Sequence, residues 1–150
     1  MTKPTSFEFS WQEAERRAFE ILLDAAGSTE GRDAFLGANP GIANVWHLEP
    51  LPIGESQLSL LAPDCPSIYM QLSAVGLYLK RDAAMALAMR LLRGLPVERD
   101  DTSNVACLRV RSVSGPNREE VDFRNEKAPI LCWEIRVTLD LAFDTGGKAF

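Results

Sequence analysis

Histidine and cysteine, two residues on which many catalytic and metal sites depend, are scarce in this sequence. There is one histidine, His47, and there are three cysteines, Cys65, Cys107 and Cys132, with wide spacing and no C-x-x-C pair. A single histidine excludes any mechanism that needs two. An odd number of widely spaced cysteines does not fit a disulfide framework. We therefore expect the protein to be cytosolic and its cysteines to act as small hydrophobic residues. We expect neither a metal nor another cofactor.

Long apolar runs and an excess of basic charge are also missing. The most apolar stretch, residues 68–79, is interrupted by Gln71, Ser73 and Gly76. It is far shorter than the roughly 20 apolar residues needed to cross a bilayer. No apolar segment typical of a secretory signal follows the N-terminus. With 16 Lys and Arg against 21 Asp and Glu, the formal charge is −5. Since phosphate binding needs a basic patch, we do not expect a nucleic acid as partner. Since no apolar run is long enough to cross a bilayer, we do not expect a membrane as partner either.

Catalytic motifs are absent from the sequence as well. It contains no G-x-S-x-G, H-E-x-x-H, Walker or G-x-G-x-x-G pattern. We expect His47, beside Trp46, to be a partly buried histidine with satisfied hydrogen bonds rather than a general base. Cys107 lies near Arg109 and Arg111, which lower a thiol pKa in principle. Without a second histidine or a motif, we predict no catalytic residue.

The composition is that of an ordinary globular domain. The chain has 150 residues, of which 46% are hydrophobic and 25% charged. This length corresponds to one domain, which we expect to span residues 1–150. We expect residues 1–9 and 144–150 to be flexible tails.

The first helix is predicted over residues 10–26, where apolar side chains recur at helical spacing. Ser10 and Glu13 match a capping box, and Gly27 stands where a left-handed C-terminal cap is favoured. Residues 27–41 are rich in turn formers and predict a loop, with a short helical turn at residues 33–36.

The second helix is predicted over residues 82–93, with Asp82 as its N-cap and Gly94 as its C-cap. Residues 97–104 are predicted to be a polar link. The apolar face of this helix is expected to consist of Ala84, Leu87, Ala88, Leu91 and Leu92.

Four segments have the composition or the alternation of strands: residues 42–48, 57–61, 105–113 and 130–143. The last of these is the clearest, with apolar residues at every odd position from Leu131 to Phe143.

Residues 67–79 also alternate, but the apolar parity changes after Gly76 to Leu77 and Leu79. A β-bulge at this glycine explains the change, so we predict one bent strand. A helix remains the alternative. The order of elements then predicts an α+β fold. A mainly antiparallel sheet carries two main helices on one face, and a long strand hairpin closes the chain.

The closing strand is long for a domain of this size. Residues 130–143 span about 46 Å when extended, whereas a compact chain of this length is about 38 Å across. The strand therefore either curls around the core or projects from it. Projection brings Trp133 at one end, or Leu141 and Phe143 at the other, onto a neighbouring molecule.

The connector before this strand, residues 114–129, is also long, because hairpin loops have about two to five residues. Its mixed charges suit contact with another protein. Three of its carboxylates, Glu119, Glu120 and Asp122, also suggest a Mg²⁺ site of a small enzyme, which is an alternative hypothesis. The candidate subunit or partner interface consists of Arg118, Glu119, Glu120, Asp122, Arg124, Glu126, Lys127, Trp133, Leu141 and Phe143.

This order of elements resembles the tail terminator, or tail-completion, proteins of long-tailed bacteriophages. The resemblance extends over the helix at 10–26, the strands around Val45 and at 68–79, the helix at 82–93 and the closing hairpin. The ending Cys-Trp-Glu-Ile-Arg-Val-Thr-Leu-Asp-Leu, residues 132–141, is similar to the closing strand of that family.

The resemblance implies a non-enzymatic virion protein without cofactors. Its copies would form a ring, usually a hexamer, that caps the tail tube, stops its polymerisation and contacts head-completion or neck proteins. Such a ring is assembled in the host cytoplasm and remains in the tail or neck of the virion. Two alternatives stay open: a head-side neck or connector protein or minor tail adaptor, and a small bacterial protein-interaction module.

Overall fold

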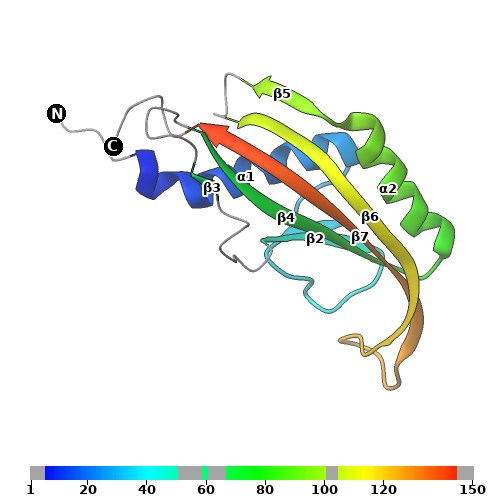
Figure 1. The fold of residues 1–150 in the computed structure, drawn as a ribbon. Helices are drawn as coiled ribbons and strands as arrows, with labels where there is room; N and C mark the ends of the chain where they lie inside the picture. Colours follow the sequence, from blue (N-terminus) through cyan, green and yellow to red (C-terminus); the bar gives the residue numbers. More distant parts are fainter. Residues whose placement is uncertain (1–5, 51–58, 61–66, 101–104, 145–150) are drawn as a thin grey trace.

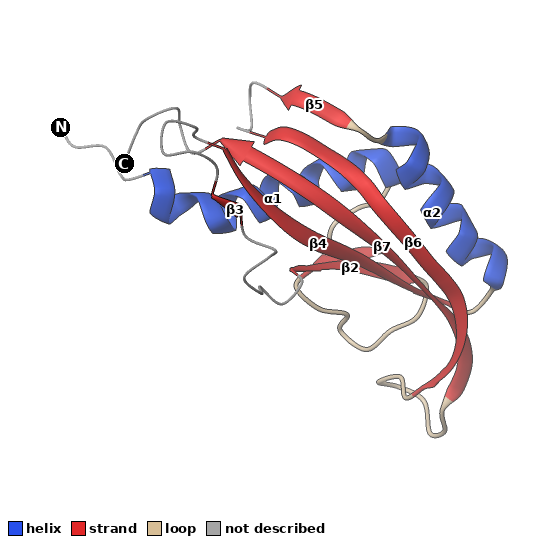
Figure 2. Cartoon of the chain, in the orientation of Figure 1, coloured by secondary structure: helices blue, strands red, loops and turns tan. Residues whose placement is uncertain are grey.

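The computed structural model describes residues 6–50, 59–60, 67–100 and 105–144. Within these residues, seven strands form one sheet with the main order β1-β2-β4-β7-β6-β5, and β3 pairs with β4. Every pairing is antiparallel except that of β1 with β2. Both helices lie on the same side of the sheet (Figures 1 and 2). The fold is α+β. The elements are α1 (Ser6–Ala26), β1 (Ala34–Leu36), β2 (Val45–Pro50), β3 (Ser59–Leu60), β4 (Ser67–Tyr78), α2 (Arg81–Gly94), β5 (Val97–Asp100), β6 (Val105–Val121) and β7 (Ile130–Asp144).

Helix α1 begins at Ser6, earlier than the sequence predicts, so Ser10 lies inside the helix and the predicted capping box is wrong. The carboxylate of Glu13 instead accepts a 2.8 Å hydrogen bond from Arg17, one turn later. The predicted C-terminal cap is present. Gly27 has a φ of +67°, and the N–H of Ser28 donates to the carbonyl of Leu23 at 2.9 Å. These are features of a Schellman motif.

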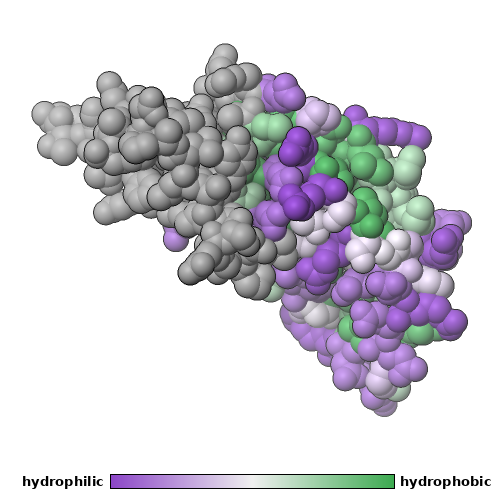
Figure 3. Space-filling view, in the orientation of Figure 1, coloured by the Kyte–Doolittle hydropathy of each residue, from purple (hydrophilic) through white to green (hydrophobic). Residues whose placement is uncertain are grey.

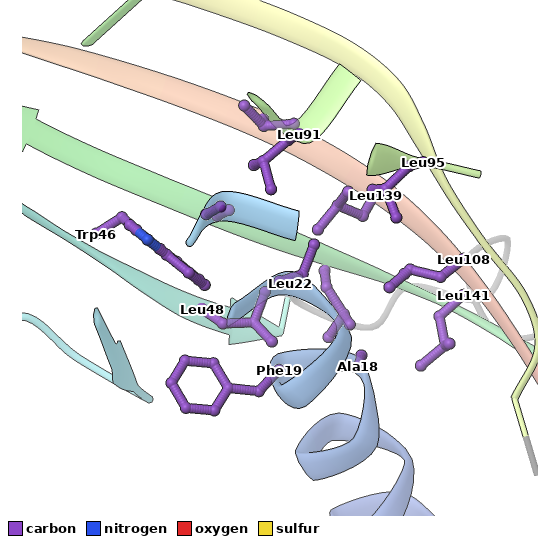
Figure 4. Packing of buried hydrophobic residues seen from close by; sticks show 14 of the residues in the cluster. Ala18, Phe19, Leu22, Trp46, Leu48, Leu91, Leu95, Leu108, Leu139 and Leu141 are labelled. Carbon is purple, nitrogen blue, oxygen red and sulfur yellow. The ribbon is translucent and has the colours of Figure 1, made fainter. Parts of the chain in front are cut away.

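The sheet edge beside α1 differs from the prediction of a helical turn at residues 33–36, because Ala34–Leu36 form strand β1. Pairing with β2 satisfies the backbone there, and the N–H of Trp46 donates to the carbonyl of Asp33 at 3.1 Å. The indole of Trp46 then meets the ring of Phe19 edge-on, with centroids 5.7 Å apart (Figure 4). Its N–H donates to the Ser28 hydroxyl at 2.9 Å. This contact joins α1 to the sheet.

Two other predicted strands are present with shifted bounds, and a second strand besides β1 was not predicted. Strand β2 occupies Val45–Pro50 and β3 occupies Ser59–Leu60. Residues 97–104 were predicted to be a polar link, but Val97–Asp100 form β5. They do so because β6 lies alongside and supplies hydrogen-bond partners, with Val97 opposite Leu108.

Strand β4 is regular through Gly76, so the predicted bulge is wrong and the predicted strand is correct. The register with β7 runs without a shift from Ser67 opposite Asp144 to Tyr78 opposite Trp133. The glycine is explained by close packing. A Cβ atom at position 76 would lie 2.6 Å from the Tyr78 ring and 2.8 Å from Leu87 of α2.

Helix α2 begins at Arg81, and its N-cap residue is Lys80, which makes no side-chain capping bond. Asp82 is therefore not the cap. It lies in the first turn, where its negative charge interacts favourably with the helix dipole and stabilises the helix. Gly94 is the last helical residue, rather than a left-handed cap, and a Cβ there would lie 2.6 Å from the Cβ of Ala25. The two helices therefore pack closely at this glycine.

The first half of the connector predicted at residues 114–129 is strand. Strand β6 continues to Val121, and three shifts in its register with β7 interrupt the ladder, the last between Ser114 and Asn117. Such irregularities bend and twist a strand pair. Accordingly, β6 and β7 curve and extend past the other strands (Figure 1).

The hydrophobic core fills the space between the helices and the facing side of the sheet (Figure 4). Strand β7 contributes a row of alternate side chains to it, as its pattern predicted. Fully buried members include Phe19, Leu22, Leu48, Leu72, Leu87, Leu91, Leu108, Ile135, Val137, Leu139 and Leu141.

Replacing Gly76 by alanine tests the close approach of α2 to β4. The added methyl group has no room between Tyr78 and Leu87, so Gly76→Ala should lower the free energy of unfolding by about 1–3 kcal/mol. Urea denaturation measures this loss. Leu87→Ala alone should cost about 2–5 kcal/mol. The double variant should lose less than the sum of the two, whereas strict additivity would contradict the proposed crowding.

Candidate interaction surface

The end of the β6–β7 hairpin projects from the sheet. Strand β4 ends at Tyr78 opposite Trp133, but β7 begins three residues earlier and pairs there with β6 alone. We call residues 119–132 the arm. It comprises three ladder pairs, about 10 Å of strand, and the turn of residues 122–129. Of the two ends considered from the sequence, the one near Trp133 is therefore the end that projects (Figure 1).

One face of the arm carries an exposed apolar side chain. Leu131 is 46% exposed, and its cross-strand neighbour is Glu120. At the base of the arm, on the same face, Trp133 is half-buried and packs against the core. The Arg118 guanidinium lies over the Trp133 ring, 5.8 Å from its centroid. Since successive strand residues alternate, this face continues the side of β7 that contacts the helices.

The other face of the arm carries a buried cysteine. Cys132 is buried, and its thiol donates to the carbonyl of Glu119 at 3.5 Å. Phe123 of the turn is buried as well. The N–H of Arg124 donates to the carbonyl of Gly41 at 2.9 Å, which ties the turn to the loop before β2. The arm is therefore held in place from one side, and its other side is open.

The seven charged residues of the predicted interface are all exposed. Three of them, Arg118, Glu119 and Glu120, lie on β6, and the turn carries the rest: Asp122, Arg124, Glu126 and Lys127. Because Glu119 and Glu120 are consecutive strand residues, they point to opposite faces. They do not converge with Asp122 as the Mg²⁺ hypothesis requires. Among the described residues, no group of three or more His, Cys, Asp or Glu side chains is arranged to hold a metal ion.

Two predicted interface residues at the far end of β7 do not belong to this surface. Leu141 is completely buried in the core, so the expectation that it contacts a neighbour is wrong for the folded chain. The backbone of Phe143 pairs with Ile68 and Val105, but its side chain lies outside the described part of the structure.

A polar network that the sequence analysis did not identify lies on the sheet face opposite the helices. Asp140 is central to one half of it and is close to Gln71 (3.4 Å), Arg111 (3.4 Å) and Arg109 (3.7 Å). It joins side chains of three neighbouring strands. The alternate polar residues of β7 were the available signal, but their partners on β4 and β6 depend on the register.

The other half of the network surrounds Arg136. Its guanidinium donates to the buried Ser73 hydroxyl at 3.1 Å and lies 3.6 Å from Glu49. Glu49 is also 2.7 Å from Nε2 of His47, whose Nδ1 is buried and has no partner among the described atoms. Thus only one ring nitrogen of His47 is satisfied, contrary to the prediction. The Ser73 oxygen accepts from Arg136 and is buried, so it is not presented as a nucleophile.

No model of a protein family matches the sequence, and no curated protein matches it. Among the described residues, no helix is long and apolar enough to cross a membrane.

The burial of Cys132 provides a test of this face of the arm. Burial, followed by the nearby Glu119 and Glu134 carboxylates, raises the pKa of the Cys132 thiol. The thiolate is the reactive form, so alkylation of Cys132 near pH 8 should be at least about tenfold slower than that of the half-buried Cys107. Peptide mass spectrometry after timed iodoacetamide treatment measures both rates.

Phe123→Ala should accelerate the alkylation of Cys132 because it removes a buried side chain of the turn and so loosens the packing at this end of the hairpin. The rate at Cys107 serves as the internal reference and should not change. Equal rates for Cys132 and Cys107 in the unsubstituted protein would contradict the burial of Cys132.

Proposed function

We propose that this chain is a structural protein that associates with itself into a ring, and that the ring terminates the tail tube of a long-tailed bacteriophage. The observation that carries the proposal is the arm. It extends beyond the core and presents an exposed leucine between charged side chains. Apolar patches rimmed by polar residues mark surfaces that contact other proteins. Leu131 and the half-buried Trp133 lie on one face of β7, with charged side chains beside them, and together supply such a patch.

The layout of the fold supports the assignment to the tail terminator class. Two helices cover one face of a mainly antiparallel sheet, and a long hairpin closes the chain. The resemblance of the sequence to tail terminator proteins is a resemblance in this same order of elements. In that class the ring, usually a hexamer, stops growth of the tube and joins the tail to the head. The partners are then the tail tube protein and a head-completion or neck protein, and the location is the virion.

Assembly, rather than catalysis, is the activity that the described side chains favour. The acidic residues of the arm point in different directions, and the histidine and serine on the other face of the sheet are engaged or buried. A ring of identical subunits needs only two complementary patches on each copy. The arm supplies one of them.

Leu131→Glu tests the role of the arm in self-association. Size-exclusion chromatography with light scattering, over a range of protein concentrations, should give a mass near six subunits for the unsubstituted protein. The variant should remain a monomer because a charge replaces the apolar contact. Its melting temperature should change little, since a substitution at an exposed site alters stability by about 0.5 kcal/mol or less.

Leu36→Glu is the matched control. Leu36 is also an exposed leucine (38%) on a strand, but it lies in β1 at the opposite edge of the sheet. This variant should assemble like the unsubstituted protein. A strict monomer at all concentrations for the unsubstituted protein would contradict the proposed ring.

A further inference from the structure

Helix α2 carries a second exposed apolar surface. Met85, Met89 and Leu92 follow one another at spacings of four and three residues, so they form one stripe along the helix. Met89 is 42% exposed and Leu92 is 45% exposed, although Leu92 was expected in the core. The core contacts come from an adjoining side of the helix, with Ala84, Leu87, Ala88 and Leu91. We call Met85, Met89 and Leu92 the α2 stripe.

The surface around the α2 stripe is also apolar. Strand β5 covers the edge of β6 only from Val105 to Leu108, so α2 lies beside a part of β6 that has no further strand next to it. Val113 of that part is 39% exposed, and its partner Val137 belongs to the core on the helix side. Figure 3 shows hydrophobic surface where α2 lies beside β6, bordered by hydrophilic residues.

The charges around the α2 stripe are opposite to those of the arm. Residues 80–94 contain four basic side chains and one acidic side chain, a net charge of +3, and all five are exposed. Two of the basic residues, Arg81 and Arg93, are one turn from Met85 and Met89 respectively. The arm contains four acidic and two basic side chains, a net charge of −2, also all exposed. Each surface thus combines an apolar centre with a charge that complements the other.

A single copy cannot bring these two surfaces together. Helix α2 begins just after β4 ends, near the base of the arm, and runs back along the sheet towards β5. The arm extends in the other direction, past the first turn of the helix (Figure 1). Its turn is also tied to the loop at Gly41. The arm is therefore available only to the α2 stripe of a different copy.

We propose that the arm of one copy docks on the α2 stripe of the next, with Leu131 against Met89 and Leu92 and with the arm's carboxylates facing Arg81 and Arg93. This inference rests on the proposed self-association and specifies the contact that produces it. Two unlike surfaces in contact make a heterologous, head-to-tail interface, and such an interface forms a ring when its repeated rotation closes.

Complementation between two defective variants tests this arrangement. Leu131→Glu removes the arm contact and leaves the stripe intact, whereas Met89→Glu with Leu92→Glu disrupts the stripe and leaves the arm intact. Each variant alone should be monomeric by native mass spectrometry. An equimolar mixture should give heterodimers with one copy of each and nothing larger, because only one functional arm and one functional stripe remain.

The possible results separate this inference from the proposed function. If the unsubstituted protein forms rings and the stripe variant does so too, the α2 stripe is not the docking site, although the ring stands. If the mixture stays monomeric, the arm and the stripe do not meet each other. If the unsubstituted protein never associates, both proposals are wrong. Circular dichroism of each variant, compared with Leu36→Glu, verifies that the fold is retained.

Discussion

The antiparallel ladder between β4 and β7 determines where most other parts of the molecule lie. Its unbroken register places the apolar side chains of β7 from Trp133 to Leu141 on the side of the helices, where they form the centre of the core. The same register places the polar side chains of β7 on the opposite face, where Arg136 and Asp140 bind partners from neighbouring strands. Strand β4 ends at Tyr78, opposite Trp133, whereas β7 extends three residues beyond this pair. The end of the ladder therefore defines where the arm begins. The core and the candidate interface therefore have one structural origin.

The parts of the fold that depend on local periodicity could be predicted from the sequence. Both helices, the closing strand and the α+β class follow from the spacing of apolar residues. The predictions were wrong where the secondary structure depends on contacts with residues far away in the sequence. Arg118, Glu119 and Glu120 were predicted to be in a loop, but β7 lies beside them and pairs with their backbone. The prediction of a bulge at Gly76 was wrong because the glycine is needed where Leu87 of α2 packs against the strand. The residue pattern of the strand alone does not reveal this contact.

The candidate interface was predictable only in part, for a related physical reason. Alternation along residues 130–143 is the same at both ends, so the sequence could not tell whether Leu131 or Leu141 projects. That choice depends on where β4 ends. The charges of the arm were evident, but the α2 stripe was not, because Leu92 fits a buried position in the helical pattern as well as an exposed one.

The central claim is that the arm contacts another copy of the same chain, and site-specific cross-linking measures this contact directly. A photoreactive residue at position 131, in an equimolar mixture of ¹⁴N- and ¹⁵N-labelled protein, would mark the peptide that the arm touches. The account predicts cross-links that join residue 131 to a peptide of α2. In half of these cross-links the two joined peptides should carry different isotopes, and in the other half they should carry the same isotope. Cross-links whose two halves always share one isotope would place the contact within a single chain and contradict the account.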